Sequence, residues 1–178
     1  LRRRQRQMCI RDRPAPDAMV LDCGCGGGAN IKTLLKLCPN GKVQGIDYSA
    51  VSVEKARKVN ARAIAAGRCT VQQASVAELP FEAEQFDVVT AFETVYFWPE
   101  LAQNFREVYR VLKPGGVFFI CNEANGETAK DDKWTQIING MTIYTDADLK
   151  VYLEQAGFCK IQSHKNKKGW PVSYTHLR

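Results

Sequence analysis

The chain has no run close to the roughly 20 consecutive apolar residues that a membrane-spanning helix needs. It also has no positively charged segment leading into the short apolar segment of a secretory signal. These absences favour a cytoplasmic protein without a membrane span. Internal repeats and low-complexity tracts are absent as well, and residues 14–170 alone suffice for one compact core. We therefore expect one domain.

Histidine is scarce, with two residues in the whole chain, and the seven cysteines are scattered. Cys23 and Cys25 form a close pair, whereas a zinc site usually takes four ligands with Cys-x-x-Cys-like spacing. A free cysteine behaves as a small buried apolar residue. We therefore predict no metal site, and we assign His164 a structural place on a late strand.

Both ends of the chain have the coding pattern of a sequencing adapter. Residues 3–12 can be encoded by a transposase-type adapter string, and residues 172–176 by the reverse complement of part of that string. We therefore interpret residues 1–13 and 171–178 as adapter-derived tails. Residues 14–170 are then predicted to be a bacterial-type, metagenomic fragment.

This interpretation changes what the net charge of the chain indicates about its partners. The formal net charge of +6 would favour a nucleic-acid or anionic-membrane partner. The two tails, however, hold seven of the 25 basic residues and one of the 19 acidic residues, which leaves 18 of each sign. We therefore predict no nucleic-acid partner.

Short apolar runs alternate with longer stretches of helical period, the pattern of an α/β fold with a mostly parallel sheet. Ser49 and Thr145 are predicted N-caps, and Gly67 and Gly157 are predicted helix stops. The predicted strands are 18–21, 42–46, 70–74, 86–91, 117–121 and 158–163, and the predicted helices are 31–37, 49–66, 101–112 and 146–155.

Two further segments complete the expected order of elements. Residues 124–133 are polar and contain glycine, so we predict a loop there, followed by a short helix that begins at Trp134. Residues 167–170 are predicted to form the turn into a closing hairpin, which the adapter-like tail interrupts. We therefore expect a domain truncated at both ends, in which the sheet lacks its last strand and any helix that preceded residue 14 is missing.

The segment 22–28 contains six glycines or cysteines in a row after Asp22 and lies between the first strand and the first helix. Its backbone N–H groups and the helix dipole can face a bound ligand, and glycine lets the ligand approach the backbone. The loop also fits the dinucleotide pattern Gly-x-Gly-x-x-Ala through Gly24, Gly26 and Ala29. An NAD(P)-binding oxidoreductase is therefore an open alternative.

Two carboxylates bear on the choice of cofactor. Asp22 stands two residues before the first glycine, where it would repel a pyrophosphate but suits the ammonium of a methionine moiety. Asp47 closes the second strand, near the ~20-residue offset at which an acidic residue accepts both ribose hydroxyls. Asp47 therefore supports nucleoside binding of either kind, and Asp22 favours a methionine-containing nucleoside.

Three further segments complete an ordered set with the glycine loop. They are Leu79-Pro80-Phe81, Phe86-Asp87-Val88-Val89 and Leu112-Lys113-Pro114-Gly115-Gly116. With Val20, Leu21 and the loop, this set resembles the class I S-adenosylmethionine (SAM) dependent methyltransferases of the small-molecule type, over nearly all of residues 18–165. The resemblance implies a Rossmann-like three-layer sandwich with a mostly parallel seven-stranded sheet of order 3-2-1-4-5-7-6.

The resemblance also implies which residues contact the cofactor. Asp22 and the loop residues Gly24, Cys25, Gly26 and Gly28 are expected at the methionine part, Asp47 at the ribose, Tyr48 beside the adenine, Ser75 and Val76 at the adenine edge, and Phe92 beside the methyl group. Many relatives carry an aspartate where this chain has Ser75, so the contact to the adenine amino group departs from the family pattern.

The acceptor pocket is expected at residues 92–98, because aromatic faces suit apolar substrates and stabilise a sulfonium cation. Tyr96 and Trp98 are predicted to line this pocket; the alternative is that Phe97 and Trp98 only pack against the following helix. Glu93 is the candidate general base or acceptor ligand, although positioning supplies much of the catalysis in methyl transfer.

The sequence thus predicts an enzyme, a SAM-dependent methyltransferase that acts on a small-molecule acceptor through O, N, S or C. Two alternatives remain open. One is the NAD(P)-binding oxidoreductase, which would require a pyrophosphate-compatible loop and a catalytic Tyr-x-x-x-Lys-like pair, and we identify no such pair. The other is a non-catalytic SAM-binding protein.

Overall fold

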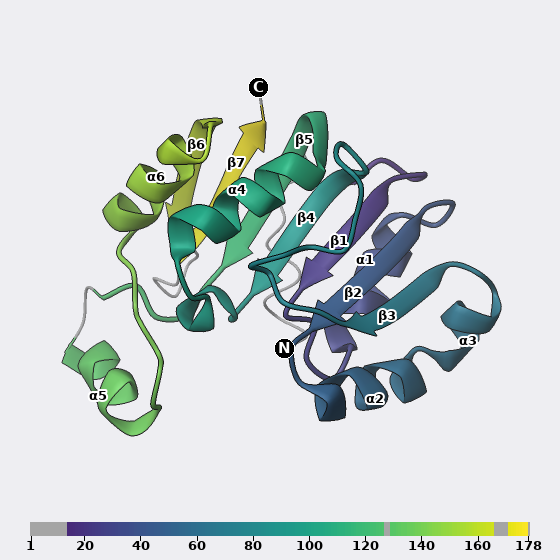
Figure 1. The fold of residues 1–178 in the computed structure, drawn as a ribbon, viewed down its shortest axis with the longest axis horizontal. Coiled ribbons are helices and arrows are strands. Elements are labelled where there is room, and N and C mark those ends of the chain that lie inside the picture. The colour runs from purple at the N-terminus through teal and green to yellow at the C-terminus, as the bar shows by residue number, and fades with distance from the viewer. Residues whose placement is uncertain (1–13, 127–128, 166–170, 178) are drawn as a thin grey trace.

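The computed structural model describes residues 14–126, 129–165 and 171–177. Its strands form one seven-stranded sheet of order β3-β2-β1-β4-β5-β7-β6. Helices cover both faces of this sheet, so the fold is the predicted three-layer α/β sandwich (Figure 1). The strands are β1 (Met19–Cys23), β2 (Lys42–Asp47), β3 (Cys69–Gln73), β4 (Phe86–Phe92), β5 (Leu112–Cys121), β6 (Phe158–Lys165) and β7 (Pro171–Leu177). The helices are α1 (Ala29–Leu37), α2 (Ala50–Val59), α3 (Ala61–Ala65), the 3₁₀ turn η3 (Val95–Phe97), α4 (Leu101–Val111), α5 (Ala129–Ile137) and α6 (Asp146–Gln155).

The strand β1 lies in the middle of the parallel part of the sheet. It pairs with β2, where Asp22 is opposite Gly45, and with β4, where Asp22 is opposite Thr90. Because the strands β1 to β5 are parallel, their carboxyl ends meet at one edge of the sheet. The loops that follow β1, β2, β3 and β4 therefore converge at this edge, where α/β sheets bind ligands.

The expectation of a missing last strand is wrong. Residues 171–177 form β7, which pairs antiparallel with β5 on one side and with β6 on the other. The segment contains valine, tyrosine and threonine, which favour strands, and an antiparallel strand is what completes the edge between β5 and β6. The interpretation of residues 171–178 as adapter-derived stays a prediction, because strand pairing does not reveal the origin of a segment, and the interpretation of residues 1–13 as a tail lies outside the described residues.

Three other boundaries differ from the sequence-based expectation. The helix predicted over residues 49–66 is divided at Asn60 into α2 and α3, because the Asn60 amide turns inward and donates to the carbonyl oxygens of Gly28 (3.0 Å) and Ala56 (2.9 Å). The predicted loop over residues 124–133 instead contains the start of α5, which begins at Ala129 and not at Trp134. The strand β5 begins at Leu112, and its pairing with β4 shifts register between Phe86 and Val88.

The predicted caps are confirmed. The Ser49 side chain accepts a hydrogen bond from the Ser52 N–H at the start of α2, and Thr145 forms a complete capping box with Asp148 at the start of α6. Gly157 follows α6 with a φ of 99°, a left-handed conformation that glycine adopts without strain.

Two buried clusters hold the layers together. One lies on the face covered by α4 and α6 and contains the rings of Phe105, Phe118 and Phe158. The other lies on the face covered by α1 and α2 and contains aliphatic side chains such as Ile31 and Val53. The helix α5 stands apart from both clusters and projects from the body of the domain (Figure 1).

The ring of Phe105 on α4 is fully buried, with the rings of Trp98 at 5.9 Å and Phe118 at 5.6 Å in edge-to-face geometry. We expect Phe105→Ala to lower the free energy of unfolding by about 3–5 kcal/mol, because a cavity remains where the ring was. Chemical denaturation would measure this loss. Val151→Ala, at a half-exposed position of α6, serves as the control and should change the free energy of unfolding by less than about 0.5 kcal/mol.

Candidate functional site

A cavity of about 800 Å³ opens where the carboxyl ends of the parallel strands converge. Loops from both halves of the parallel sheet line it, together with a short segment that follows α5. The lining residues are Gly24, Gly26, Ile46, Asp47, Tyr48, Ser49, Ser52, Ala74, Val76, Phe92, Glu93, Thr94, Phe97, Trp98, Pro99, Asn139 and Gly140. The volume lies high in the ~300–1,000 Å³ range of ligand pockets, so there is room for two adjacent ligand moieties.

The glycine loop has the backbone conformation that requires glycine. Gly24, Gly26 and Gly28 have φ values of 70°, 51° and 77°, all in the left-handed region. At Gly24 a Cβ atom would also overlap the side chain of Thr94, so the loop approaches the end of β4 closely. The loop therefore presents bare backbone to the cavity at Gly24 and Gly26.

The Asp47 carboxylate lies at the end of β2 and is only 9% exposed. Its Oδ2 accepts from the Gly26 N–H at 2.8 Å, and its Oδ1 accepts from the Ser49 N–H at 2.9 Å. Each carboxylate oxygen can accept a second hydrogen bond. Asp47 thus holds the glycine loop in place and still has the capacity to receive two hydroxyl groups.

Asp22 lies behind the glycine loop and is fully buried. Its Oδ1 accepts from the Thr90 hydroxyl at 2.8 Å, while its Oδ2 has no hydrogen-bond partner among the described residues. Burial raises the pKa of Asp22 to about 7, the Thr90 hydrogen bond opposes this rise, and the charge of Asp47 adds to it. A cation in the cavity would stabilise the ionised form of this carboxyl.

Glu93 follows β4 and has a φ of 59°, a left-handed conformation that is uncommon for a residue with a side chain. Its Oε2 accepts from the Glu123 N–H at 3.1 Å and lies 3.4 Å from the Tyr96 hydroxyl. Such conformations persist where the surroundings hold them, and they cluster at functional sites. The Glu93 side chain is therefore held at the cavity by one contact from Tyr96, three residues later, and one from the segment that follows β5.

The aromatic residues of the segment 92–98 divide between the cavity and the core. Phe92, Phe97 and Trp98 line the cavity, and Phe97 is 47% exposed there. Trp98 also stacks on Phe118 at 6.2 Å, so it has both the predicted pocket role and the alternative packing role. Tyr96 is buried, and the cavity lining does not include it.

Several residues that the sequence indicated lie near the cavity without lining it. Cys25 is buried beside Gly45. Gly28 is the N-cap of α1 and packs against Asn60 and Ala56. Ser75 accepts from the Ala77 N–H at 3.2 Å and shapes the turn that brings its neighbours Ala74 and Val76 to the cavity.

Asn139 and Gly140, which were not predicted from the sequence, line the cavity from the segment between α5 and α6. Asn-Gly is a strong turn signal, and Gly140 has a φ of 77°. The dipeptide could therefore have been recognised as a turn. Nothing local in the sequence indicates that this turn reaches the cavity.

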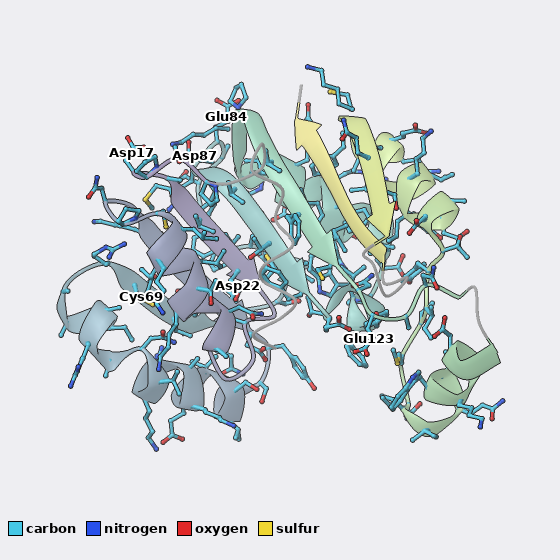
Figure 2. All side chains as sticks on the ribbon, turned by 180° about the vertical axis from the view of Figure 1, so that it is seen from behind. Asp17, Asp22, Cys69, Glu84, Asp87 and Glu123 are labelled. Carbon is cyan, nitrogen blue, oxygen red and sulfur yellow. The ribbon has the colours of Figure 1, made fainter. Side chains whose placement is uncertain are left out.

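Two of the motif segments lie at the opposite edge of the sheet. Asp87 accepts from the Met19 N–H and pairs with Lys113, both at 2.8 Å. Figure 2 shows Asp87 with Asp17 at this edge, whereas Glu123 lies at the edge with the cavity. These segments therefore fasten the starts of β1, β4 and β5 and do not contact the cavity.

The positions of Tyr109 and Lys113 argue against the oxidoreductase alternative. The expectation that the chain has no Tyr-x-x-x-Lys pair is wrong, because Tyr109 and Lys113 have this spacing. Tyr109 packs on Phe158 at 5.5 Å, and Lys113 pairs with Asp87. The pair lies away from the cavity and cannot serve as a catalytic dyad there.

Within residues 14–126, 129–165 and 171–177, no group of three or more histidine, cysteine, aspartate or glutamate side chains could hold a metal ion. Within the same ranges, no helix has the length and apolar character that crossing a bilayer requires.

The sheet order, the glycine loop and the acidic end of β2 together define a nucleoside-binding α/β domain of the class I methyltransferase type. Residues 21–120 match the methyltransferase domain family. This match covers more than half of the chain. The chain therefore belongs to this family, the class I SAM-dependent methyltransferases.

Individual relatives agree with this assignment. The chain is 30% identical over 128 residues to 24-methylenesterol C-methyltransferase 2 of Arabidopsis thaliana, a match that covers 71% of this chain and 35% of that protein. It is 35% identical over 111 residues to demethylmenaquinone methyltransferase of Symbiobacterium thermophilum, with 62% and 44% covered. The chain thus spans less than half the length of these two relatives.

A solved structure shows the same fold. The geranyl diphosphate C-methyltransferase of Streptomyces coelicolor, in complex with Mg²⁺, geranyl-S-thiolodiphosphate and S-adenosyl-L-homocysteine, has a TM-score of 0.85 to this chain at 13% identity. The similarity covers 99% of this chain and 76% of that one. At this identity the similarity demonstrates the fold alone.

The buried Asp22 generates a prediction about pH. Its pKa is about 7 in the folded protein and about 4 in an unfolded chain. Between these values the native state binds more protons than the unfolded state, so the free energy of unfolding should fall as the pH rises from 4 to 7 and level off above 7, by about 4 kcal/mol for this group. Denaturant titrations at several pH values would measure the fall.

The control is Asp22→Asn, which keeps the size of the side chain and an acceptor for Thr90. This variant should lose the decline between pH 4 and pH 7, whereas Asp17→Asn, at an exposed position, should retain it. Parallel stability curves for the wild type and Asp22→Asn would contradict the assignment of the raised pKa to Asp22.

Proposed function

We propose that the chain binds SAM in the cavity and transfers its methyl group to a small organic acceptor. The observation that carries this proposal is the convergence of the bare glycine loop and the Asp47 carboxylate on one cavity. Backbone N–H groups and a carboxylate with spare acceptor capacity suit a nucleoside whose ribose hydroxyls are free. When bound, SAM supplies a methyl group that its sulfonium has already activated.

The residues of this chain then have distinct roles. Asp47 accepts the ribose hydroxyls, Tyr48 and Val76 flank the adenine with Ser75 at its edge, and the backbone of Gly24 and Gly26 faces the methionine part. Asp22 supports the loop from behind and supplies negative charge towards the ammonium; this matches the unpartnered state of its Oδ2. Phe92 lies at the end of β4, where the methyl group would be presented.

The acceptor side of the cavity has apolar walls and one carboxylate. Phe97, Trp98 and Pro99 provide the walls, and Glu93 provides the carboxylate. We infer an acceptor with an apolar body that presents an O–H or N–H group to Glu93. The names of the two relatives, one for a sterol and one for a demethylmenaquinone, support a large apolar body.

The chemical step balances with these groups. The lone pair of the acceptor oxygen or nitrogen forms the bond to the methyl carbon while the carbon–sulfur bond breaks and leaves its electron pair on sulfur. The proton of the acceptor passes to the Glu93 carboxylate and then to solvent. The protein contributes mainly by holding the two reacting atoms in line, since alignment supplies much of the rate in such displacements.

The cofactor assignment predicts selective binding. Calorimetric titration of the chain with SAM should give micromolar affinity, and titration with NADH should give no binding. Asp47→Ala should weaken SAM binding about 10- to 100-fold, because it removes charge-assisted hydrogen bonds of ~1.5–3 kcal/mol. Asp17→Ala, an exposed carboxylate at the far edge of the sheet, is the matched control and should bind SAM as the wild type does (Figure 2).

Two outcomes would replace the proposal. Binding of NADH without SAM would favour an oxidoreductase. Binding of SAM with no methyl transfer to a panel of phenols, sterols and aromatic amines would favour a non-catalytic SAM-binding protein.

A further inference from the structure

We propose that Tyr96 is a positioning residue: it fixes the Glu93 carboxylate and the acceptor wall of the cavity relative to each other without touching the acceptor. The proposal rests on the proposed function in one respect, because it takes Glu93 as the group that receives the acceptor proton. The contacts that carry it are independent of any assigned activity.

The Tyr96 hydroxyl lies at the centre of a small hydrogen-bond network. It accepts from the Ala124 N–H at 2.8 Å, and its own proton can go to the Ala124 carbonyl oxygen at 3.2 Å or to Glu93 Oε2 at 3.4 Å. The Glu123 N–H donates to the same Glu93 oxygen at 3.1 Å. The hydroxyl therefore ties Glu93, after β4, to the segment that follows β5.

The backbone of Tyr96 forms a hydrogen bond with a third segment, the one between α5 and α6. Its carbonyl oxygen accepts from the Thr142 N–H at 2.8 Å. Thr142 follows closely on Asn139 and Gly140, which form part of the cavity wall. Tyr96 thus connects the end of β4, the residues after β5 and the segment between α5 and α6, and each of these three segments contributes to or adjoins the cavity.

Burial keeps this connection intact. The Tyr96 side chain is 4% exposed. Burial, together with the negative charge of Glu93, raises the pKa of Tyr96 above its usual range. The phenol therefore remains protonated at physiological pH and can always donate. A hydrogen bond to a charged group in such surroundings contributes more than one at the surface.

The backbone of Glu93 explains why such a connection is needed. Its left-handed conformation costs of order 1–3 kcal/mol and persists only if the surroundings determine it. The contacts from Tyr96 and Glu123 act on the side chain of this same residue. Without the Tyr96 hydroxyl, the Glu93 carboxylate would keep one of these two contacts and would occupy a wider range of positions.

A role in core packing alone would also explain the burial of Tyr96, so the test must separate the two. A residue that acts through Glu93 loses its effect once Glu93 is altered, whereas packing effects on distant groups add independently. The experiment is a double-mutant cycle of Tyr96→Phe, Glu93→Gln and the double variant. Tyr152→Phe, a partly buried tyrosine of α6 outside the cavity, is the matched control.

The first readout is turnover with the best acceptor from a panel of phenols, sterols and aromatic amines. We expect Tyr96→Phe to lower kcat about tenfold through misplacement of Glu93, and Glu93→Gln to lower it about 100-fold through loss of the proton acceptor. The double variant should match Glu93→Gln alone. SAM affinity should stay within about twofold of wild type in all three variants, since Asp47 and the glycine loop are unchanged, and Tyr152→Phe should leave kcat unchanged.

Additive losses in the double variant, or an unchanged kcat in Tyr96→Phe, would overturn the proposal. The second readout is the same cycle on the free energy of unfolding, which needs no acceptor. If the protein binds SAM but methylates nothing, the proposed function fails. The cycle on the free energy of unfolding still tests whether Tyr96 and Glu93 are coupled. Non-additive destabilisation would then support the connection between Tyr96 and Glu93, and additive destabilisation would overturn it.

Discussion

The carboxylate of Asp47 connects the two loops on which the cavity depends. It accepts from the Gly26 N–H in the loop after β1 and from the Ser49 N–H at the start of α2. A carboxylate that is only 9% exposed is costly unless donors surround it, and these two backbone groups meet that need. The register of β1 against β2, in which Cys23 lies opposite Ile46, brings the two loops within reach of each other. The position of the cavity at this edge is therefore a consequence of sheet register as much as of the glycines.

Much of this could be predicted from the sequence, because the signals are local. Short apolar runs predicted the positions of the strands. Ser49 and Thr145 indicated where two helices begin, because N-capping depends on neighbours only a few residues away. Asp47 was identified because the length of a βαβ unit fixes where the second strand ends. These features depend on interactions between residues close in the sequence, or on the length of the βαβ unit that α/β folds share.

The remaining features depend on contacts between segments far apart in the chain. Asn60 interrupts a helical pattern because its amide reaches Gly28, 32 residues earlier. Tyr96 was predicted to line the pocket, but it points instead to Ala124, 28 residues later. Asn139 and Gly140 reach the cavity from beyond α5. Nothing in the local sequence shows such contacts, and an aromatic residue in a pocket-forming segment can turn towards either the cavity or the core.

The position of β7 has a consequence for how the chain reaches its final form. The strand lies between β5 and β6, although it follows both of them in the sequence. The edge of β5 therefore stays unpaired until residues 171–177 have been synthesised, and β6 has no partner in the sheet before then. An unpaired strand edge readily joins other chains. The parallel half, from β3 to β5, needs no later segment to form its strand pairs, whereas β6 joins the sheet only through β7, so a chain in which β7 has not yet docked exposes two unpaired strand edges.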